Sequence, residues 1–232
     1  MTAGLGACVL VLEASTRVGA VAVLTPEGAA TRTVTLGAGE DDVLWAAALD
    51  ALTEAGMSVP RVEAVVCGDG PGSFTSLRIA AALAKGVAHG TGCPLVAVPS
   101  LLLAATALEP PGAYLVHADA IRGERFVLPV AVDAAGQVDA HLPVRRLPLS
   151  ALAEAASGRL RAAVLASPEP EAEALLLTPV AHRIGRLHPR WLRAPVELSR
   201  WEPAYGRLAE AQVQWEAREG IPLPGGGGAP PA

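Results

Sequence analysis

The chain has 232 residues, enough for one domain or two compact ones with a buried core. Hydrophobic residues make up 51% and aromatic residues only 3%, so the core must be built from Ala, Val and Leu. The formal net charge of -5 argues against a dedicated nucleic-acid-binding protein, because such proteins usually carry a basic excess.

The cysteines and the apolar runs indicate the compartment. Cys8, Cys67 and Cys93 lie in or beside apolar runs and lack the spacing of metal ligands, which is typical of buried thiols in a reducing compartment. The first residues do not resemble a secretion signal, and no stretch reaches the roughly 18 apolar residues of a membrane span. We therefore expect a cytoplasmic protein with no membrane partner.

The first half of the chain predicts a strand meander followed by alternating helices and strands. Three short strands joined by tight turns are expected at 7–15, 18–28 and 29–37. A helix is expected at 40–56, with acids in its first turn and Gly56 as its C-cap. Further along, a strand at 61–68, a helix ending near residue 90, a strand at 93–100 and a helix at 101–108 are expected.

The second half begins with a copy of the opening pattern. Residues 113–136 and 7–28 both read as an apolar strand, an acid followed by Ala, an arginine, a second strand and a glycine turn. The acids are Glu13 and Asp119, and the match indicates an internal duplication. A helix near 150–157, a strand at 161–167 and helices at 169–187 are expected to follow.

These patterns divide the chain into three parts. We expect an N-terminal subdomain at 1–110, a C-terminal subdomain at 111–218 and a disordered Gly/Pro-rich tail at 219–232. The boundary is placed at the prolines that precede Gly112. We expect the last helical segment of the second subdomain to pack back on the first subdomain.

The sequence GDGPGSFT, at 68–75, lies between a strand and a helix, where many proteins bind phosphate. It lacks the lysine of a Walker A loop, since Lys85 comes about ten residues later, and Ser73 stands at the third glycine of a Rossmann fingerprint. Three interpretations stay open: a tight structural turn capped by the hydroxyl of Ser73 or Thr75, an anion site, and a contact with a partner.

The acids at strand ends, the histidines and the basic stretch give weaker indications of function. Glu13 and Asp119 stand where a nucleotide-binding fold carries acids, or they accept hydrogen bonds from backbone N–H groups at strand ends. No two histidines have the spacing of a helical metal site, and Ser73 lacks the surroundings of a hydrolase nucleophile. The basic stretch 182–193, which contains Trp191, suits either an RNA backbone or a solvated helix end.

Four segments together resemble a known family. The stretch GDGPGSFTSLRIAAALAKGVA is similar to the loop and helix signature of the TsaB (YeaZ) family. The segments LVLEASTRVGAVAV, HADAIRGERFV and WEPAYGRLAE resemble that family's opening hairpin, second hairpin and closing motif. The chain departs from the family pattern at Glu13, Asp69 and Ser76, and by one inserted residue after Asp119.

The resemblance implies a fold and a role. It implies an α/β actin-like ATPase (ASKHA) fold with two related subdomains, each a mixed sheet flanked by helices. It also implies a non-catalytic subunit that activates a TsaD-type transferase, which forms N6-threonylcarbamoyladenosine in ANN-decoding tRNAs. A TsaE-type ATPase is a further implied partner, tRNA is reached through the complex, and a homodimer is expected when the chain is alone.

The rival hypotheses are an ATP-dependent phosphotransferase and a metallopeptidase-like enzyme of the same superfamily. The first needs a short acid at position 13 and a Gly-Thr phosphate turn, and the second needs a histidine pair. We predict no catalytic residue, no metal ligand and no required cofactor, and weak binding of ATP or ADP stays open.

The candidate contact residues fall into two sets. The set for a nucleotide or a partner consists of Glu13, Ser15, Thr16, Gly68, Asp69, Gly70, Pro71, Gly72, Ser73, Phe74, Thr75, Arg78 and Asp119. The set for a partner interface on the Ala-rich helices consists of Val43, Leu44, Ala47, Leu77, Ala81 and Lys85. On this interpretation, Ala47→Glu or Ala81→Glu weakens the complex and leaves the monomer folded.

Overall fold

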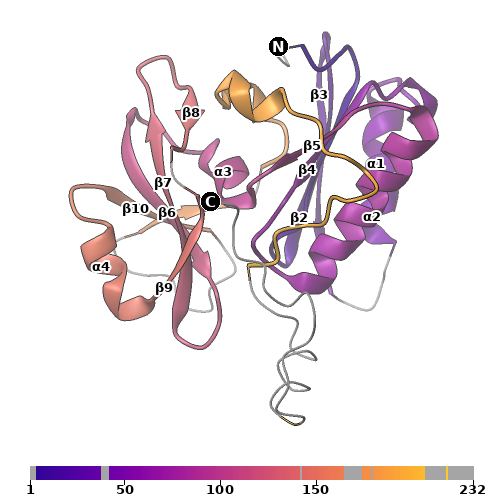
Figure 1. The fold of residues 1–232 in the computed structure, drawn as a ribbon. Helices are drawn as coiled ribbons and strands as arrows, with labels where there is room; N and C mark the ends of the chain where they lie inside the picture. Colours follow the sequence, from indigo (N-terminus) through magenta and orange to yellow (C-terminus); the bar gives the residue numbers. More distant parts are fainter. Residues whose placement is uncertain are drawn as a thin grey trace.

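The computed structural model describes residues 4–37, 42–141, 143–164, 174–178, 180–206 and 218. Two sheets stand side by side with a short helix between them, and the remaining helices cover the outer faces (Figure 1). The predicted end of the second subdomain and the predicted tail lie mostly outside the described residues.

The first sheet contains five strands in the order β3-β2-β1-β4-β5. The strands are β1 (Val9–Glu13), β2 (Val18–Thr25), β3 (Gly28–Thr35), β4 (Ala64–Gly68) and β5 (Leu95–Val98). β1 pairs antiparallel with β2 and parallel with β4. The predicted meander and the next two strands are therefore confirmed.

Helices cover both faces of the first sheet because its central strands are apolar on both sides. Leu10, Leu12 and Val65 point toward α1 (Val43–Glu54) and α2 (Phe74–Thr91), in one buried cluster. Val11 and Val66 point the other way, into a second cluster that contains α3 (Ser100–Ala105) and reaches the second sheet.

The second sheet repeats the plan of the first. Its main path runs β11-β10-β6-β7-β8, and β9 also pairs with β7. The strands are β6 (Gly112–Asp119), β7 (Glu124–Val132), β8 (Val138–Asp139), β9 (Arg145–Pro148), β10 (Leu160–Val164) and β11 (Leu175–Leu177). Like β1, β6 pairs antiparallel with the next strand and parallel with a later one, which supports the predicted duplication.

Four 3-10 helices and one short α-helix complete the described part. The 3-10 helices are η1 (Val59–Arg61), η2 (Leu149–Ala151), η3 (Ile184–Arg186) and η4 (Pro189–Leu192). Helix α4 (Leu152–Ala155) follows η2 and packs on the outer face of the second sheet, where Leu152 meets Leu115 and Val127.

Some local predictions need correction. Within the predicted helices at 169–187, the described residues form the strand β11 and the single turn η3, and residues 165–173 lie outside the description. The Leu-rich run at 175–177 extends the sheet because β10 offers it a parallel edge. Helix α1 spans Val43–Glu54 with Ala55 as its C-cap and no acid in its first turn, so the predicted first-turn acids and the Gly56 C-cap are wrong. Gly56 follows the cap with a φ of 65°, a conformation that favours glycine.

After η4, the chain returns to the first sheet. Residues 193–206 run from the central region across α2 (Figure 1, orange). The N–H of Val196 donates to the carbonyl oxygen of Leu95 in β5 at 2.8 Å. Of the described helices, none is both long and apolar enough to span a membrane.

Candidate functional site

The loop between β4 and α2 is packed against the chain's own backbone. A Cβ on Gly72 would collide with the carbonyl oxygen of Ser15 and would lie 2.7 Å from its Cα. The N–H of Ser73 donates to that same carbonyl oxygen at 2.8 Å. The glycine is therefore required by the segment after β1, which fills the space in front of the loop.

Other amide groups of the loop are also used internally. The N–H of Asp69 donates to the carbonyl oxygen of Val98 at 2.8 Å. The N–H of Gly70 donates to the Ser100 hydroxyl at 3.0 Å, and the Gly70 carbonyl accepts from the Ser100 N–H at 2.8 Å. These bonds leave fewer donors for an anion than the sequence pattern suggests.

Glu13 lies behind the loop and is fully buried. Its Oε1 accepts from the N–H of Ser15 at 2.6 Å, as expected of a strand-end acid that bonds to the backbone. Its other oxygen fills the space beside Gly68, where a Cβ would collide with it. Burial raises the pKa of Glu13, and hydrogen bonds with Ser15 and Ser100 only partly oppose the shift.

The second acid of the duplicated hairpins has a separate role. Asp119 accepts from the guanidinium of Arg125 at 2.7 Å and from the N–H of Ile121 at 3.2 Å, so it stabilises the β6–β7 turn. Ile121 and Arg122 adopt φ angles of 65° and 55° in that turn. Thr16 is likewise local, because its hydroxyl both donates to and accepts from the backbone of Val18.

The start of α2 carries the remaining loop residues. Ser73 is the N-cap residue, but its hydroxyl bonds to that of Ser76 at 3.0 Å and makes no cap hydrogen bond, so the predicted hydroxyl cap is wrong for Ser73. Thr75 and Arg78 are exposed. The ring of Phe74 lies 4.5 Å from that of Tyr205, and the Arg78 guanidinium lies 5.4 Å from the Phe74 ring centroid.

Residues far along the chain complete this site, and the prediction did not include them. The indole N–H of Trp201 donates to Asp69 Oδ1 at 3.1 Å, and the N–H of Ala204 donates to the Asp69 carbonyl at 2.7 Å. A Cβ on Gly206 would lie 2.7 Å from the Cβ of Pro71 and 2.6 Å from the ring of Phe126. In the sequence, the WEPAYG segment is visible only as part of the family motif, and nothing in it indicates a contact with the loop.

The interface residues predicted on the helices are mostly inaccessible. Leu44, Ala47, Leu77 and Ala81 are buried within the chain and are not accessible to a partner in this structure. The interface on the two helices stays a prediction. Val43 and Lys85 are half-buried. On α2, positions 77, 81 and 85 share one side, and Lys85 Nζ lies 5.7 Å from the Trp201 ring centroid. The chain's own segment 193–206 therefore runs along this side.

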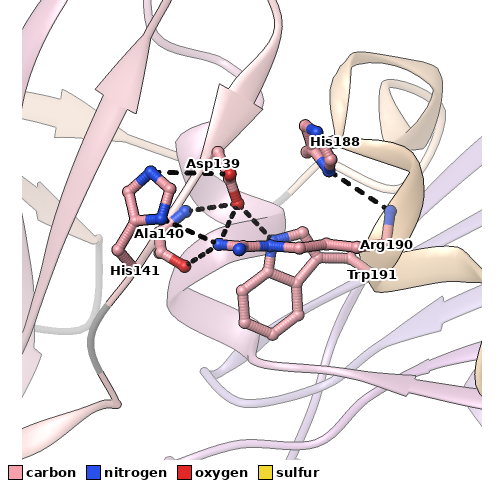
Figure 2. Close-up of polar contacts among 6 residues, drawn as sticks. All are labelled: Asp139, Ala140, His141, His188, Arg190 and Trp191. Atoms are coloured by element: carbon pink, nitrogen blue, oxygen red, sulfur yellow. Dashed lines mark hydrogen bonds and ion pairs between the residues drawn. The ribbon is translucent and has the colours of Figure 1, made fainter.

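Most arginines of the basic stretch 182–193 bind within the chain. Arg183 pairs with Glu109 at 3.1 Å, and Arg186 donates to the carbonyl oxygens of Gly136 and Thr106 at 2.8 and 2.6 Å. Figure 2 shows Arg190 directed at Asp139, with a distance of 2.6 Å to Oδ1. These bonds favour a structural tie between η3, η4 and the second sheet over an RNA-binding surface.

Asp139 is the centre of that tie. Its Oδ1 also accepts from the indole N–H of Trp191 at 2.7 Å and from the N–H of Ala140 at 2.8 Å (Figure 2). Burial acts to raise the pKa of Asp139, but the hydrogen bonds and the Arg190 charge outweigh it and hold the pKa below its usual value of 3.8.

We expect Asp139→Asn to destabilise the protein by about 1–2 kcal/mol at pH 7, because the charge-assisted bonds become neutral. Since the folded pKa lies below 3.8, this contribution is complete above pH 3.8 and is lost as the pH falls through the folded value. Urea unfolding at pH 7 and at pH 3.5 measures the difference, with the exposed Asp50→Asn as control. An equal effect of both substitutions at pH 7 would contradict the tie.

Comparisons with known proteins find similarity in both sequence and fold. A family model described as "TsaD: tRNA N6-adenosine threonylcarbamoyltransferase" matches residues 42–128, which include the loop and α2. The tRNA threonylcarbamoyladenosine biosynthesis protein TsaB of Escherichia coli K12 is 42% identical over 53 residues. The TsaB protein of Haemophilus influenzae is 38% identical over 56 residues.

The two curated matches are short, and the structural matches are long. The E. coli match covers 23% of both chains, and the H. influenzae match covers 24% of both. A Pseudomonas aeruginosa structure described as similar to peptidase YeaZ has a TM-score of 0.72 and 25% identity, covering 87% of this chain and 100% of its own. YeaZ from P. aeruginosa has a TM-score of 0.73 and 24% identity, with coverage of 86% and 100%.

The long structural matches show that this chain has the YeaZ fold, in which two mixed sheets are flanked by helices. The shorter sequence matches carry the TsaB name. The comparisons therefore show the YeaZ fold and a short stretch of sequence similar to TsaB proteins, in agreement with the resemblance seen in the sequence.

Proposed function

We propose that this chain is a non-catalytic subunit that binds and activates a TsaD-type threonylcarbamoyltransferase in tRNA modification. The names of the matched relatives support a place in threonylcarbamoyladenosine biosynthesis. The observation that carries the non-catalytic part is the loop itself, in which Gly72 packs against the backbone of Ser15.

The same geometry argues against tight nucleotide binding at the loop. A phosphate needs free amide donors at a helix start, yet Ser73 donates its N–H to Ser15 and Gly70 donates to Ser100. A metal between a phosphate and Glu13 would need a solvent-facing carboxylate, whereas this carboxyl is fully buried and its burial raises its pKa. These residues do not fit ATP–Mg²⁺.

The metallopeptidase alternative finds no support either. Among the residues that the model describes, no three His, Cys, Asp or Glu side chains are grouped so that they could hold a metal ion. In our proposal, the transfer chemistry belongs to the partner, and this chain acts in the cytoplasm through the complex.

The outward sides of α1 and α2 are the surface that we propose for the partner. Along α1, the exposed positions Ala46, Leu49, Asp50 and Thr53 follow the helical period and form one strip. Leu49 is 39% exposed, and Ala82 is exposed on the neighbouring helix α2. Small side chains allow a partner helix to approach closely. We assign the homodimer of the isolated chain to the same surface, and a TsaE-type ATPase to the assembled complex.

The test is reconstitution of tRNA modification. We expect a purified TsaD-type subunit from the same source to modify tRNA at background rate alone and to be activated when this chain is added. Full modification without this chain would contradict activation. Hydrolysis of ATP–Mg²⁺ by this chain alone would contradict its non-catalytic role. If this chain binds the TsaD-type subunit in gel filtration but does not raise the rate of tRNA modification, it is a passive partner and not an activator.

A further inference from the structure

Residues 193–206 form a strap that joins the two sheets. The strap leaves η4 beside the second sheet and crosses α2 toward the loop (Figure 1). Its side chains Val196, Leu198 and Trp201 are partly buried against the cluster that packs between α1, α2 and the first sheet. Its first half is therefore attached to the first sheet by apolar contacts and by the bond from Val196 to Leu95.

The second half of the strap closes over the glycine loop. The N–H of Ala204 donates to the Asp69 carbonyl oxygen at 2.7 Å and lies 3.3 Å from Asp69 Oδ1. Trp201 donates its indole N–H to the same Oδ1 at 3.1 Å. A Cβ on Gly70 would lie 2.7 Å from the Ala204 carbonyl oxygen, so strap and loop are in close contact.

Asp69 is the one loop residue with an ionisable side chain, and both side-chain bonds that it accepts come from the strap. In the described part of the chain, none of the ion pairs found includes Asp69. Glu13 and Cys67 are its titratable neighbours at the ends of β1 and β4. Helix α2 carries Arg78, Lys85 and His89. The strap carries Arg193, Glu197, Arg200, Glu202 and Tyr205, of which Arg200 pairs with Glu197 at 3.5 Å. Lys85 lies over the Trp201 ring and Arg78 over the Phe74 ring.

We propose that the strap is latched to the loop at Asp69 and that the latch holds more tightly when the Asp69 carboxyl is neutral. A protonated carboxyl still accepts both N–H groups through its carbonyl oxygen. An ionised carboxyl at the same place must remain half-buried without a paired cation, and that charge is relieved when the strap opens and water reaches it.

The electrostatics of the site agree with this direction. Burial raises the pKa of Asp69 to about 6, from a usual value of 3.8, although hydrogen bonds from Ala204 and Trp201 act to lower it. In the proposed open state, water surrounds the carboxyl and its pKa returns to the usual 3.8, so closure is strongest below pH 3.8 and weakens as the pH rises toward 6. A difference of two pKa units changes the ratio of closed to open molecules by roughly a hundredfold in total, of which about tenfold falls between pH 5 and pH 8.

Hydrogen exchange within 201–205 measures closure at the amides of Trp201, Glu202, Ala204 and Tyr205, since Pro203 carries no amide hydrogen. Each rate is divided by the intrinsic exchange rate at the same pH, which gives a protection factor, and the amides of β2 serve as an internal reference. In the full chain, we expect protection at 201–205 to fall about tenfold from pH 5 to pH 8, with no matching fall in β2.

Two variants separate the latch from other titrations. Asp69→Asn cannot ionise, so its protection is expected to be independent of pH and, at pH 8, at least tenfold above that of the natural chain. Glu27→Gln, at the exposed turn between β2 and β3, is the matched control and should behave as the natural chain does. Equal protection of the natural chain at pH 5 and pH 8 would overturn the proposal, as would an unchanged pH dependence in Asp69→Asn.

A third variant tests the proposal even if Asp69→Asn does not fold. Trp201→Phe keeps an aromatic ring but removes the donor that stabilises the charged carboxylate. Protection should fall at both pH values, and the midpoint of its pH dependence should move to higher pH. An unmoved midpoint would show that Asp69 is not the titrating group. None of these measurements uses a partner protein, so they are independent of the proposed function.

Discussion

Replacing Gly72 with alanine is expected to destabilise the protein by about 3 kcal/mol or more. The new Cβ would collide with the carbonyl oxygen of Ser15 and lie 2.6 Å from its Cβ. Ser15 follows the buried strand β1, and its carbonyl oxygen already accepts the N–H of Ser73. Because the opposing atoms are the backbone and Cβ of Ser15, which cannot turn aside as a flexible side chain could, relief requires the loop to move.

Gly86→Ala is the matched control. Gly86 lies within α2, and a Cβ there meets no heavy atom within 4 Å. Alanine favours a helix interior over glycine by about 0.5–1 kcal/mol, so this variant should be slightly more stable than the natural chain. Urea unfolding followed by circular dichroism measures both variants. Equal stability of Gly72→Ala and the natural chain would mean that the loop does not pack on Ser15 in solution.

The second large effect is expected at α1, where two adjacent alanines face opposite ways. Ala47 is 5% exposed and packs in the cluster against the first sheet, whereas Ala46 is exposed. Ala47→Glu places a carboxylate in an apolar core without a partner, and we expect a loss of about 4 kcal/mol or complete unfolding. Ala46→Glu should change stability by less than about 0.5 kcal/mol.

This pair also revises the interface hypothesis. The sequence predicts that Ala47→Glu disrupts a complex and spares the monomer, but its burial predicts damage to the monomer itself. Ala46→Glu is the variant that should remain folded and lose binding to a TsaD-type subunit in gel filtration. If Ala46→Glu binds as well as the natural chain does, the outward side of α1 is not the partner surface.

Much of the architecture could be predicted because short-range patterns encode it. The apolar strands 9–13 and 64–68 and the helix that begins after Ser73 were located within a few residues. The duplicated hairpins correctly indicated two sheets of the same plan. The pattern failed at 175–177, where a Leu-rich run pairs with the edge of β10 and so forms a strand where a helix was expected. That choice depends on a neighbouring strand and not on local propensity.

The sequence predicts which residues form the loop of the candidate site, but not which residues pack against that loop. The sequence located the loop, the buried acid at position 13 and the family motif, because each is a contiguous pattern. It could not show that Ser15 fills the space before Gly72, or that Trp201 bonds to Asp69 across 132 residues of sequence. It also could not show that Ala46 is exposed whereas Ala47 is buried.

The sequence by itself therefore determined the family resemblance, the order of most elements and the absence of a Walker A lysine from the loop. Only the tertiary structure decided that the loop is closed by its own chain, that the helix residues chosen for a partner are largely buried, and that a strap ends on Asp69. The physical reason is that a glycine or a carboxyl acquires its role from atoms that fill the space beside it. Those atoms come from parts of the chain that only folding brings together.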